Sequence, residues 1–447
     1  MKAFKAYDIR GLWNSEINAE IAYKIGYFIP KVFDVNKILV GRDIRLSSDG
    51  FFCALTDGMT DAGADVYDAG LTTTPMVYWG TGKFNFEASV MITASHNSSG
   101  YNGLKFSAKN VQPIGYDNGL NILESLVESN TPVIKKSKGY ISKFDYIDDY
   151  VKFLNKYKQD YSELKISIDC SNGMAALFAK ELFGIKPDYI NEVMDGSFPG
   201  HEPNPLAPEN QQQIKNIVKK NCSDVGVIFD GDADRVMFID ENGMFISPDL
   251  IIALLGHYFF EERNEKGKVV QDIRTSKAVG EYLKRFNAEL VIWKVGRAFA
   301  ATRLKEVDGV YGGELAGHYY FRDFYYSDSG LMAALIVLNI IKKFKTRGIT
   351  FSGLISRISS YANTGEVNFV VAEKQKAMDE VLAYFKNNEP PVEFFDFDGY
   401  RLEFNDWWFN IRPSNTEPFL RFLAEAKSEE MLSEKTALVY KILEKYS

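Results

Sequence analysis

Residues 225–240 read VGVIFDGDADRVMFID, and this stretch holds the clearest structural pattern in the chain. Two apolar runs rich in valine and isoleucine enclose one short acidic turn, which predicts two buried strands. Similar runs occur at residues 37–41, 64–69, 88–93, 165–170, 269–273 and 290–295. Stretches with a helical period separate most of these runs, as crossover helices separate parallel strands. The sequence therefore predicts an α/β fold.

The chain has 447 residues, which is about three times the typical length of one domain. Changes of pattern nevertheless predict four unequal segments. They fall in the basic, polar stretch 131–140, before the helical run 249–262, and near residues 361–365. Beyond the last change we expect paired strands and a terminal helix. The predicted domains are residues 1–143, 144–247, 248–362 and 363–447.

Composition and charge exclude several classes of protein. Hydrophobic residues make up 46% and charged residues 25%, which excludes a disordered or fibrous chain. The formal net charge of −8 gives no reason to expect a nucleic-acid partner. Three widely spaced cysteines provide neither a disulfide framework nor a Cys-x-x-Cys pair. No signal peptide or membrane-spanning stretch is recognisable, so we expect a cytoplasmic protein without a membrane partner.

The acidic turn between the two strands is a candidate metal site. Asp230, Asp232 and Asp234 place three carboxylates within five residues, and they would raise one another's pKa unless a cation compensated them. Small residues at Gly231 and Ala233 allow the turn to curl so that all three face one point. Such an all-oxygen site suits Mg²⁺.

Two other interpretations of the turn are open. Glu241 falls at the twelfth position of a calcium-binding EF-hand loop, but Arg235 stands where that loop requires glycine. Strands are also expected on both sides, where an EF-hand has helices. The turn could otherwise be a solvated acidic surface loop.

A hydroxyl-bearing segment follows the predicted strand at residues 88–93. It reads TASHNSSGYNGLK over residues 93–105 and includes Ser95. Ligands of α/β proteins gather beyond the carboxyl ends of strands, which places Ser95 in a favourable region. Serine at the end of a strand is also a common helix N-cap, so this interpretation stays open.

Two glycine- or proline-bounded turns are candidate sugar and phosphate sites. Residues 312–318 read GGELAGH, where one carboxylate, Glu314, can accept hydrogen bonds from two neighbouring hydroxyls. Residues 412–418 read RPSNTEP, which combines a guanidinium, two hydroxyls and an amide for binding a phosphate. Either segment could instead be a structural turn with solvated or capping side chains.

These four segments, in this order, resemble the α-D-phosphohexomutase family. The opening FKAYDIRG at residues 4–11 resembles the phosphomannomutase/phosphoglucomutase branch, and the resemblance covers essentially the whole chain. It implies three similar α/β domains and a smaller C-terminal α+β domain around a central cleft. One loop from each domain would line that cleft.

The resemblance implies an activity as well as a fold. The expected enzyme interconverts hexose 6-phosphate and hexose 1-phosphate, of mannose, glucose or both, through a phosphoserine and a hexose 1,6-bisphosphate. Mg²⁺ would be its cofactor, the bisphosphate its primer, and small hexose phosphates its only expected partners. The oligomeric state is left open, with a monomer favoured.

Residue roles follow from the same resemblance. Ser95 matches the phosphoserine and, with Asp230, Asp232 and Asp234, the metal ligands. Lys105 matches a general acid and base at the sugar hydroxyl, a role that nearby positive charge would assist by lowering its pKa. The expected catalytic residues are Ser95, Lys105, Arg235, His96 and Arg10. The expected substrate-binding residues are Tyr7, Arg274, Lys294, Arg297, Glu314, His318, Arg412, Ser414, Asn415 and Thr416.

Three positions depart from the family pattern. Ala316 stands where the sugar loop commonly has serine, Arg297 where histidine is usual, and Ser98 where proline is expected. The missing hydroxyl keeps a phosphoglucosamine or phosphoacetylglucosamine mutase of the same family open. A non-catalytic sugar-phosphate sensor is the alternative from another class.

Overall fold

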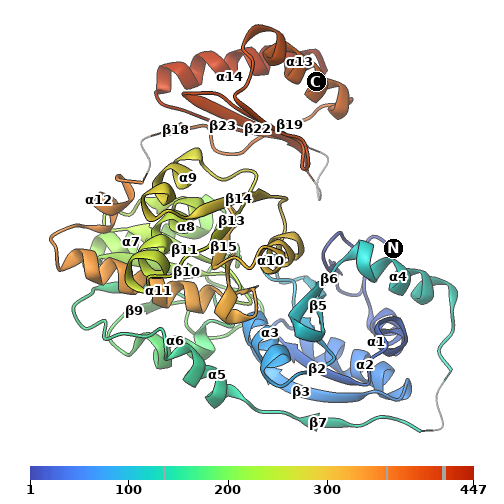
Figure 1. Cartoon of the computed structure of the whole chain (residues 1–447). Helices are drawn as coiled ribbons and strands as arrows, with labels where there is room; N and C mark the ends of the chain where they lie inside the picture. Colours follow the sequence, from blue (N-terminus) through green and yellow to red (C-terminus); the bar gives the residue numbers. More distant parts are fainter. Residues whose placement is uncertain (134–136, 359–360, 415–418, 447) are drawn as a thin grey trace.

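A computed structural model of the chain describes residues 1–133, 137–358, 361–414 and 419–446. The described residues form four sheets, each covered by helices, in the order of the sequence. Figure 1 shows three α/β units in blue, green and yellow to orange, with a separate C-terminal unit in red.

The first sheet has seven strands in the order β1-β5-β4-β2-β3-β7, with β6 paired to β5. Strands β4, β2, β3 and β7 run parallel, whereas β5 runs antiparallel to both β4 and β1. Its strands are β1 (Ile9–Leu12), β2 (Lys37–Arg42), β3 (Asp65–Leu71), β4 (Ala88–Ile92), β5 (Tyr101–Ala108), β6 (Gln112–Ile114) and β7 (Ile141–Lys143). Its helices are α1 (Ala19–Phe33), α2 (Ser48–Asp61), α3 (Thr74–Lys83) and α4 (Leu120–Ser129).

The second sheet has five strands in the order β12-β11-β10-β8-β9. Parallel β8, β9 and β10 are extended by the antiparallel hairpin of β10 and β11. The strands are β8 (Ile166–Asp169), β9 (Asp188–Ile190), β10 (Val225–Phe229), β11 (Val236–Asp240) and β12 (Phe245–Ile246). The helices are α5 (Ile147–Leu154), α6 (Ala176–Phe183) and α7 (Gln212–Asn221).

The third sheet has the strand order β14-β13-β15-β16-β17. Parallel β14, β13 and β15 are followed by antiparallel β16 and β17. The strands are β13 (Lys268–Asp272), β14 (Glu289–Trp293), β15 (Tyr311–Gly313), β16 (Tyr319–Phe321) and β17 (Ser327–Asp328). The helices are α8 (Pro248–Gly256), continued by the π-helical turn η4 (His257–Glu262), then α9 (Lys277–Leu283), α10 (Arg297–Glu306), α11 (Gly330–Lys345) and α12 (Phe351–Ile355).

The fourth sheet is antiparallel throughout and has α13 and α14 on one face (Figure 1). Its strands are β18 (Ala362–Asn363), β19 (Val367–Phe369), β20 (Glu393–Phe395), β21 (Tyr400–Glu403), β22 (Trp407–Pro413) and β23 (Leu420–Ala426). The helices are α13 (Lys374–Asn388) and α14 (Glu429–Leu443). Short 3₁₀ turns complete the described structure at residues 109–111, 116–118, 208–211, 284–286, 322–324 and 444–446.

The predicted fold class is confirmed. Each strand-like run of the sequence forms a strand within one or two residues of its expected ends, and residues 394–404 form the pair β20 and β21. Three α/β units are followed by a smaller mixed one, as the resemblance implied.

The buried hydrophobic clusters do not follow the boundaries between the four sheets. The largest buried cluster runs without a break from Leu39 and Trp79 in the first unit, through Tyr150, to Leu335 and Phe351 in the third. The C-terminal unit has its own cluster between its sheet and α13 and α14. One cluster therefore spans the first three units, whereas the fourth unit has its own; the first unit also has a second, separate cluster between its sheet and α1, α2 and α4.

Candidate active site

Ser95 lies in the loop that follows β4, where the chain turns back into β5. Since a strand and not a helix follows, the N-cap interpretation is wrong. The backbone of Ser95 is left-handed, with φ of 52°, a conformation that costs energy in a residue with a side chain. Its buried hydroxyl donates to Asp230 Oδ2 at 2.8 Å. The loop thus aims a strained serine at the acidic turn.

The acidic turn joins β10 to β11, and its three aspartates are buried. Both the EF-hand and the solvated-loop interpretation are therefore wrong. One oxygen each of Asp230, Asp232 and Asp234 lies within 4.8 Å of the others. A Cβ at Gly231 would come within 2.5 Å of the Ser95 carbonyl, so only glycine permits this approach of the two loops.

The donor atoms of this cluster fit a small divalent cation. Oδ1 of Asp232 and Oδ1 of Asp234 are buried and have no hydrogen-bond partner among the described residues. Buried carboxylate oxygens without a partner are costly, and an oxygen-seeking cation would satisfy them. The turn could therefore hold a metal ion.

Lys105 of β5 points at the same turn. Its Nζ lies 2.6 Å from Asp232 Oδ2 and 2.5 Å from Asp234 Oδ2. Burial raises the pKa of Asp234, but the charge of Lys105 outweighs burial and lowers it. Asp230 has no such contact with Lys105, and burial together with repulsion from Asp234 and Asp232 raises its pKa well above the usual value.

The expectation that positive surroundings would lower the pKa of Lys105 is wrong for this arrangement. Burial by itself lowers that pKa, but Asp232 and Asp234 outweigh burial and raise it. Lys105 is therefore an ammonium that neutralises part of the aspartate cluster.

Arg235 connects this turn to the third unit. Its Nε lies 3.9 Å from Asp230 Oδ2 and donates to His318 Nε2 at 2.9 Å. Across the ring, His318 Nδ1 lies 2.7 Å from Asp328 Oδ2, and Arg297 Nε lies 3.1 Å from Asp328 Oδ1. A continuous chain of polar contacts therefore runs from the serine loop into the third unit.

Arg297 and Glu314 are held firmly by neighbouring protein groups. The Arg297 guanidinium stacks 3.7 Å from the centroid of the Tyr78 ring in addition to its ion pair. Glu314 is buried, accepts from the Gly296 N–H at 2.7 Å and accepts from the hydroxyl of Tyr320. Both carboxylate oxygens of Glu314 thus already have one protein donor each.

Arg10 and His96, both expected from the first unit, lie at the serine loop. Arg10 donates to Asn97 of the serine loop at 2.7 Å. Burial lowers the pKa of His96 well below its usual value, and the charges of Arg235 and Arg10 lower it further. His96 is therefore neutral.

Tyr7 and Lys294 make contacts away from the acidic turn. The Tyr7 hydroxyl donates to the Val295 carbonyl at 3.1 Å. The ammonium of Lys294 lies 5.6 Å from the centroid of the Phe299 ring. Tyr7 therefore links the first unit to the turn that precedes α10.

Arg274 and Arg412 bring positive charge to the boundary between the third and fourth units. Arg274 pairs with Asp272 at 2.9 Å, and Arg412 pairs with Asp398 at 3.3 Å. Burial lowers the pKa of Arg412, and repulsion from Arg274 lowers it further. Two like charges close together suit a dianion. The expected residues Asn415 and Thr416 lie outside the described residues.

Comparison with known proteins identifies the family to which this chain belongs. Four domain descriptions of the phosphoglucomutase/phosphomannomutase family match the chain in order. Alpha/beta/alpha domains I, II and III match residues 1–132, 145–243 and 247–361, and the C-terminal domain matches residues 366–440. The chain belongs to the α-D-phosphohexomutase family. It is a phosphohexomutase, an intramolecular phosphotransferase.

Relatives of this phosphohexomutase span its whole length. A phosphomannomutase of Vibrio cholerae is 35% identical over 100% of this chain and 99% of its own. A solved phosphoglucomutase/phosphomannomutase family protein of Burkholderia thailandensis is 27% identical, covers 99% and 97% of the two chains, and has a TM-score of 0.87. An Aspergillus fumigatus N-acetylphosphoglucosamine mutase, solved with GlcNAc-6P and magnesium, is 16% identical, covers 91% and 82%, and has a TM-score of 0.55.

Sequence reasoning missed Arg45, which holds the serine loop of the phosphohexomutase. This buried guanidinium donates to the carbonyls of Ser95 at 2.8 Å and of Asn97 and Ser98 at 2.7 Å each. It also pairs with Asp43 at 3.1 Å. The available signal was the charged cluster directly beyond the end of β2, the strand beside β4.

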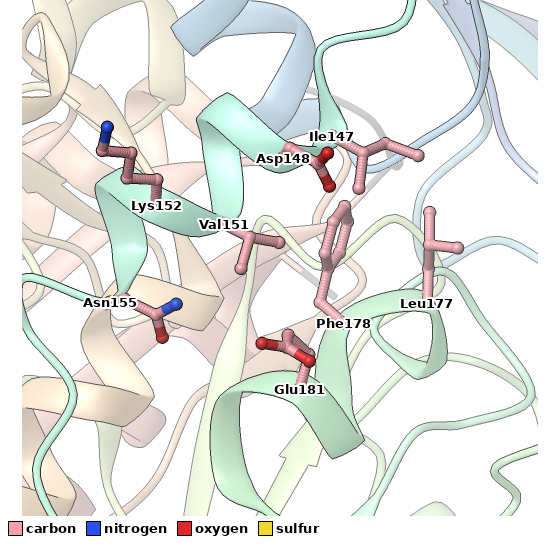
Figure 2. A pocket seen from close by; sticks show the side chains of 8 residues that line it. All are labelled: Ile147, Asp148, Val151, Lys152, Asn155, Leu177, Phe178 and Glu181. Carbon is pink, nitrogen blue, oxygen red and sulfur yellow. The ribbon is translucent and has the colours of Figure 1, made fainter.

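A groove elsewhere on the phosphohexomutase has none of these features. It lies between α5 and α6, has a volume of about 470 Å³, and is shown in Figure 2. Its lining contains none of the residues expected to take part in catalysis or binding. Among the described helices, none combines the length and the apolar character that a membrane crossing requires.

Proposed function

We propose that this phosphohexomutase interconverts the 6-phosphates and 1-phosphates of mannose, glucose or both through a phosphorylated Ser95. The observation that carries the proposal is the meeting of the strained Ser95 hydroxyl, the aspartate cluster and Lys105 at one buried point. A nucleophile, a candidate metal site and an acid–base group are the parts that phosphoryl transfer needs.

The proposed transfer step uses groups of this chain. A sugar hydroxyl oxygen attacks the phosphorus of phosphoserine, and the hydroxyl proton passes to a base. The bond from phosphorus to Ser95 Oγ breaks, and Oγ keeps its electron pair and takes up a proton to restore the serine hydroxyl. Arg235 is suited to neutralise charge on the transferring group, because Arg235 and Ser95 both lie at Asp230. His96 and Arg10, which lie beside the serine loop, would help to orient the phosphoryl oxygens.

Lys105 is the proposed acid and base, provided that its ion pairs with Asp232 and Asp234 weaken during the reaction. Its contacts with Asp232 and Asp234 hold the proton on Nζ, so Lys105 can accept a proton only after those contacts weaken. A Mg²⁺ ion bound by Asp230, Asp232 and Asp234, with an oxygen of phosphoserine, would supply positive charge to both the carboxylates and the transferring phosphoryl group.

The far end of the substrate would lie against the C-terminal unit. Arg274, Arg412, Ser414, Asn415 and Thr416 are the proposed phosphate-binding residues, since two arginines already meet there. Tyr7, Lys294, Arg297, Glu314 and His318 are the proposed sugar-side residues. The hexose 1,6-bisphosphate formed by the first transfer would turn between the two ends before the second phosphate returns to Ser95. Bisphosphate therefore also serves as the primer.

Mannose and glucose phosphates are the favoured substrates. The phosphomannomutase of Vibrio cholerae, which is 35% identical over the whole of this chain, supports this choice. Ala316 provides no hydroxyl to the sugar, which leaves an amino-sugar phosphate as the alternative substrate. The substrate panel below therefore includes amino sugars. The cytoplasmic location expected from the sequence is a proposal that cell fractionation tests. The oligomeric state, for which the sequence only favours a monomer, can be measured by light scattering.

The test is a ³¹P NMR panel on the full chain with Mg²⁺ and a glucose 1,6-bisphosphate primer. It offers the 6-phosphates of mannose, glucose, glucosamine and N-acetylglucosamine. We expect turnover of mannose or glucose phosphate, a phosphate on Ser95 by mass spectrometry, and nearly complete loss of turnover in Ser95→Ala. The matched control is Ser99→Ala in the same loop, which should retain activity. Turnover of only an amino sugar, or full activity in Ser95→Ala, contradicts the proposal, and no turnover of any sugar favours the sensor.

A further inference from the structure

Three arginines meet at the boundary between the third and fourth units. Arg412 of β22 and Arg421 of β23 are directly opposite cross-strand partners, so their side chains lie on one face of the sheet. Burial lowers the pKa of Arg412, and Arg274 of the third unit lies close enough to lower it further by repulsion. Like charges side by side are destabilising unless an anion lies among them. This arginine cluster therefore requires negative charge nearby.

Glu366 supplies negative charge to the arginine cluster. It lies between β18 and β19, where the chain enters the fourth unit. Its Oε1 lies 2.8 Å from Arg421 Nη1, and its Oε2 lies 3.6 Å from Arg274 Nη1. Burial lowers the pKa of Arg412, and the charge of Glu366 acts in the opposite direction. One carboxylate thus acts on all three arginines and bridges the two units.

Glu366 is held differently from the two aspartates that also pair with the cluster. Asp272 accepts from the backbone N–H of Arg274 at 2.7 Å. Asp398 accepts from the backbone N–H of Val295 at 2.8 Å. Within the described part of the chain, both ion-pair partners of Glu366 are arginine side chains, and 25% of its own side chain is exposed. Glu366 can therefore turn into solvent while the two aspartates keep their backbone contacts.

We propose that Glu366 is an internal competitor of the far phosphate, which pairs with the arginine cluster in the free enzyme and turns away when the phosphate binds. The inference rests on the proposed function, because it takes this cluster as the place of the far phosphate. It also adds Arg421 to the residues that bind the phosphate.

A phosphate dianion is the better partner for the arginine cluster. It carries more charge and more acceptor oxygens than a carboxylate, and it repels Glu366. Nε of Arg412 is buried and has no hydrogen-bond partner among the described residues, so Glu366 leaves a donor of the cluster unsatisfied. A phosphate oxygen can satisfy such a donor.

Competition of this kind assists the turn of the bisphosphate. The far phosphate must leave the arginine cluster before the other end of the sugar can take its place. Leaving buried arginines without an anion is costly, because their charge is then uncompensated. A carboxylate that pairs with them as the phosphate leaves reduces this cost. Glu366 therefore weakens phosphate binding and eases release.

The test measures binding without turnover. Isothermal titration calorimetry of the full chain with Ser95→Ala gives the Kd of glucose 1,6-bisphosphate, because this variant takes up no phosphoryl group at residue 95. Glu366→Gln keeps the size of the side chain and can still accept from an arginine, but it carries no charge. We expect it to lower Kd by about 2–30-fold, the equivalent of two partly exposed ion pairs. The matched control is Glu393→Gln, at an exposed carboxylate on β20 of the same unit, which should leave Kd unchanged.

The direction of the change separates competition from structural support. If Glu366 only holds the arginines in place, Glu366→Gln and Glu366→Ala weaken binding. If it competes with the phosphate, both variants tighten binding, and KM falls when Glu366→Gln is made in the enzyme with Ser95 intact. An unchanged or higher Kd in the folded variants overturns the proposal.

Crystals of the wild-type protein grown with glucose 1,6-bisphosphate give a test that needs no variant. A phosphate should lie against Arg274, Arg412 and Arg421, with the Glu366 carboxylate turned into solvent. A phosphate that lies there while Glu366 keeps both ion pairs overturns the proposal, and so does a phosphate that binds away from these arginines.

The outcomes distinguish this inference from the proposed function. A protein that turns over mannose or glucose phosphate, but binds the bisphosphate no more tightly in Glu366→Gln, overturns only the inference. A protein that binds it more tightly in that variant, but turns over no hexose phosphate, overturns only the proposed function. A protein that binds no hexose phosphate overturns both.

Discussion

Replacing Lys105 by methionine should destabilise the metal-free protein and make its stability strongly dependent on Mg²⁺. Met has a similar length and apolar bulk but carries no charge. The change leaves Asp232 and Asp234, both buried, without the ammonium that lies 2.6 and 2.5 Å away. Removing one partner of a buried ion pair costs about 3–5 kcal/mol, because the remaining charge is uncompensated.

The expected shift in melting temperature follows from the shared core. One hydrophobic cluster extends through all three of the first units, so we expect them to unfold as one body of roughly 350 residues. At about 2.1 cal/mol/K per residue, a loss of 3–5 kcal/mol lowers Tm by about 4–7 °C. If Mg²⁺ binds the aspartate cluster as proposed, saturating Mg²⁺ would supply the missing charge and should recover most of this loss.

The assay is differential scanning calorimetry of wild type and Lys105→Met, each with EDTA and with excess Mg²⁺. Lys109→Met, at an exposed lysine just beyond the same strand, is the matched control and should melt like the wild type. If Lys105→Met melts with the wild type in EDTA and gains no more from Mg²⁺, Lys105 does not neutralise the cluster.

Three other predictions concern pH, docking and substrate choice. Burial lowers the pKa of His201, but the hydrogen bond to Asp169 outweighs burial and raises that pKa. The pair therefore stabilises the folded protein at low pH, where His201 is protonated, and this stabilisation is lost as the pH rises through the raised pKa. The gap in Tm between wild type and His201→Gln should accordingly be larger at pH 5.5 than at pH 8.5, and an equal gap contradicts it. Arg401→Met removes two hydrogen bonds of 2.7 Å that join the fourth unit to carbonyls of the third. We expect the fourth unit to move away from the third, so that small-angle scattering shows a larger radius of gyration. Lys376→Met, at an exposed lysine, is the control and should leave the radius of gyration unchanged. Ala316→Ser should change the ratio of mannose to glucose phosphate turnover by about 2–13-fold, the equivalent of one net hydrogen bond, and an unchanged ratio means that this position does not read the sugar.

Local pattern was enough to predict the strands and the place of the acidic turn. The apolar runs on both sides of Asp230 could only be satisfied in a buried sheet, and a turn between them had to lie at its edge. The rule that loops gather beyond the carboxyl ends of strands likewise placed Ser95 near a site. Its contact with Asp230, 135 residues away, is the consequence of that rule.

Contacts set by the order of strands could not be read from the sequence. Arg45 holds the serine loop because β2 lies beside β4, and no local period encodes that order. Asp328 reaches Arg297 and His318 only after β15, β16 and β17 have paired. The lowered pKa that would assist the acid–base role of Lys105 is not found for the same reason, because carboxylates from another unit raise that pKa.

The separate core of the C-terminal unit has a consequence for how this enzyme can change over time. Because α13 and α14 pack on their own sheet, the unit has a hydrophobic cluster of its own. It meets the third unit through hydrogen bonds and through one aromatic contact, between Trp293 and Phe397. If the C-terminal unit binds the far phosphate as proposed, substitutions at that boundary would change phosphate binding without changing the residues around Ser95. Under the proposed function, exchanging this unit between relatives would transfer the binding of the far phosphate and leave the residues of the transfer step in place.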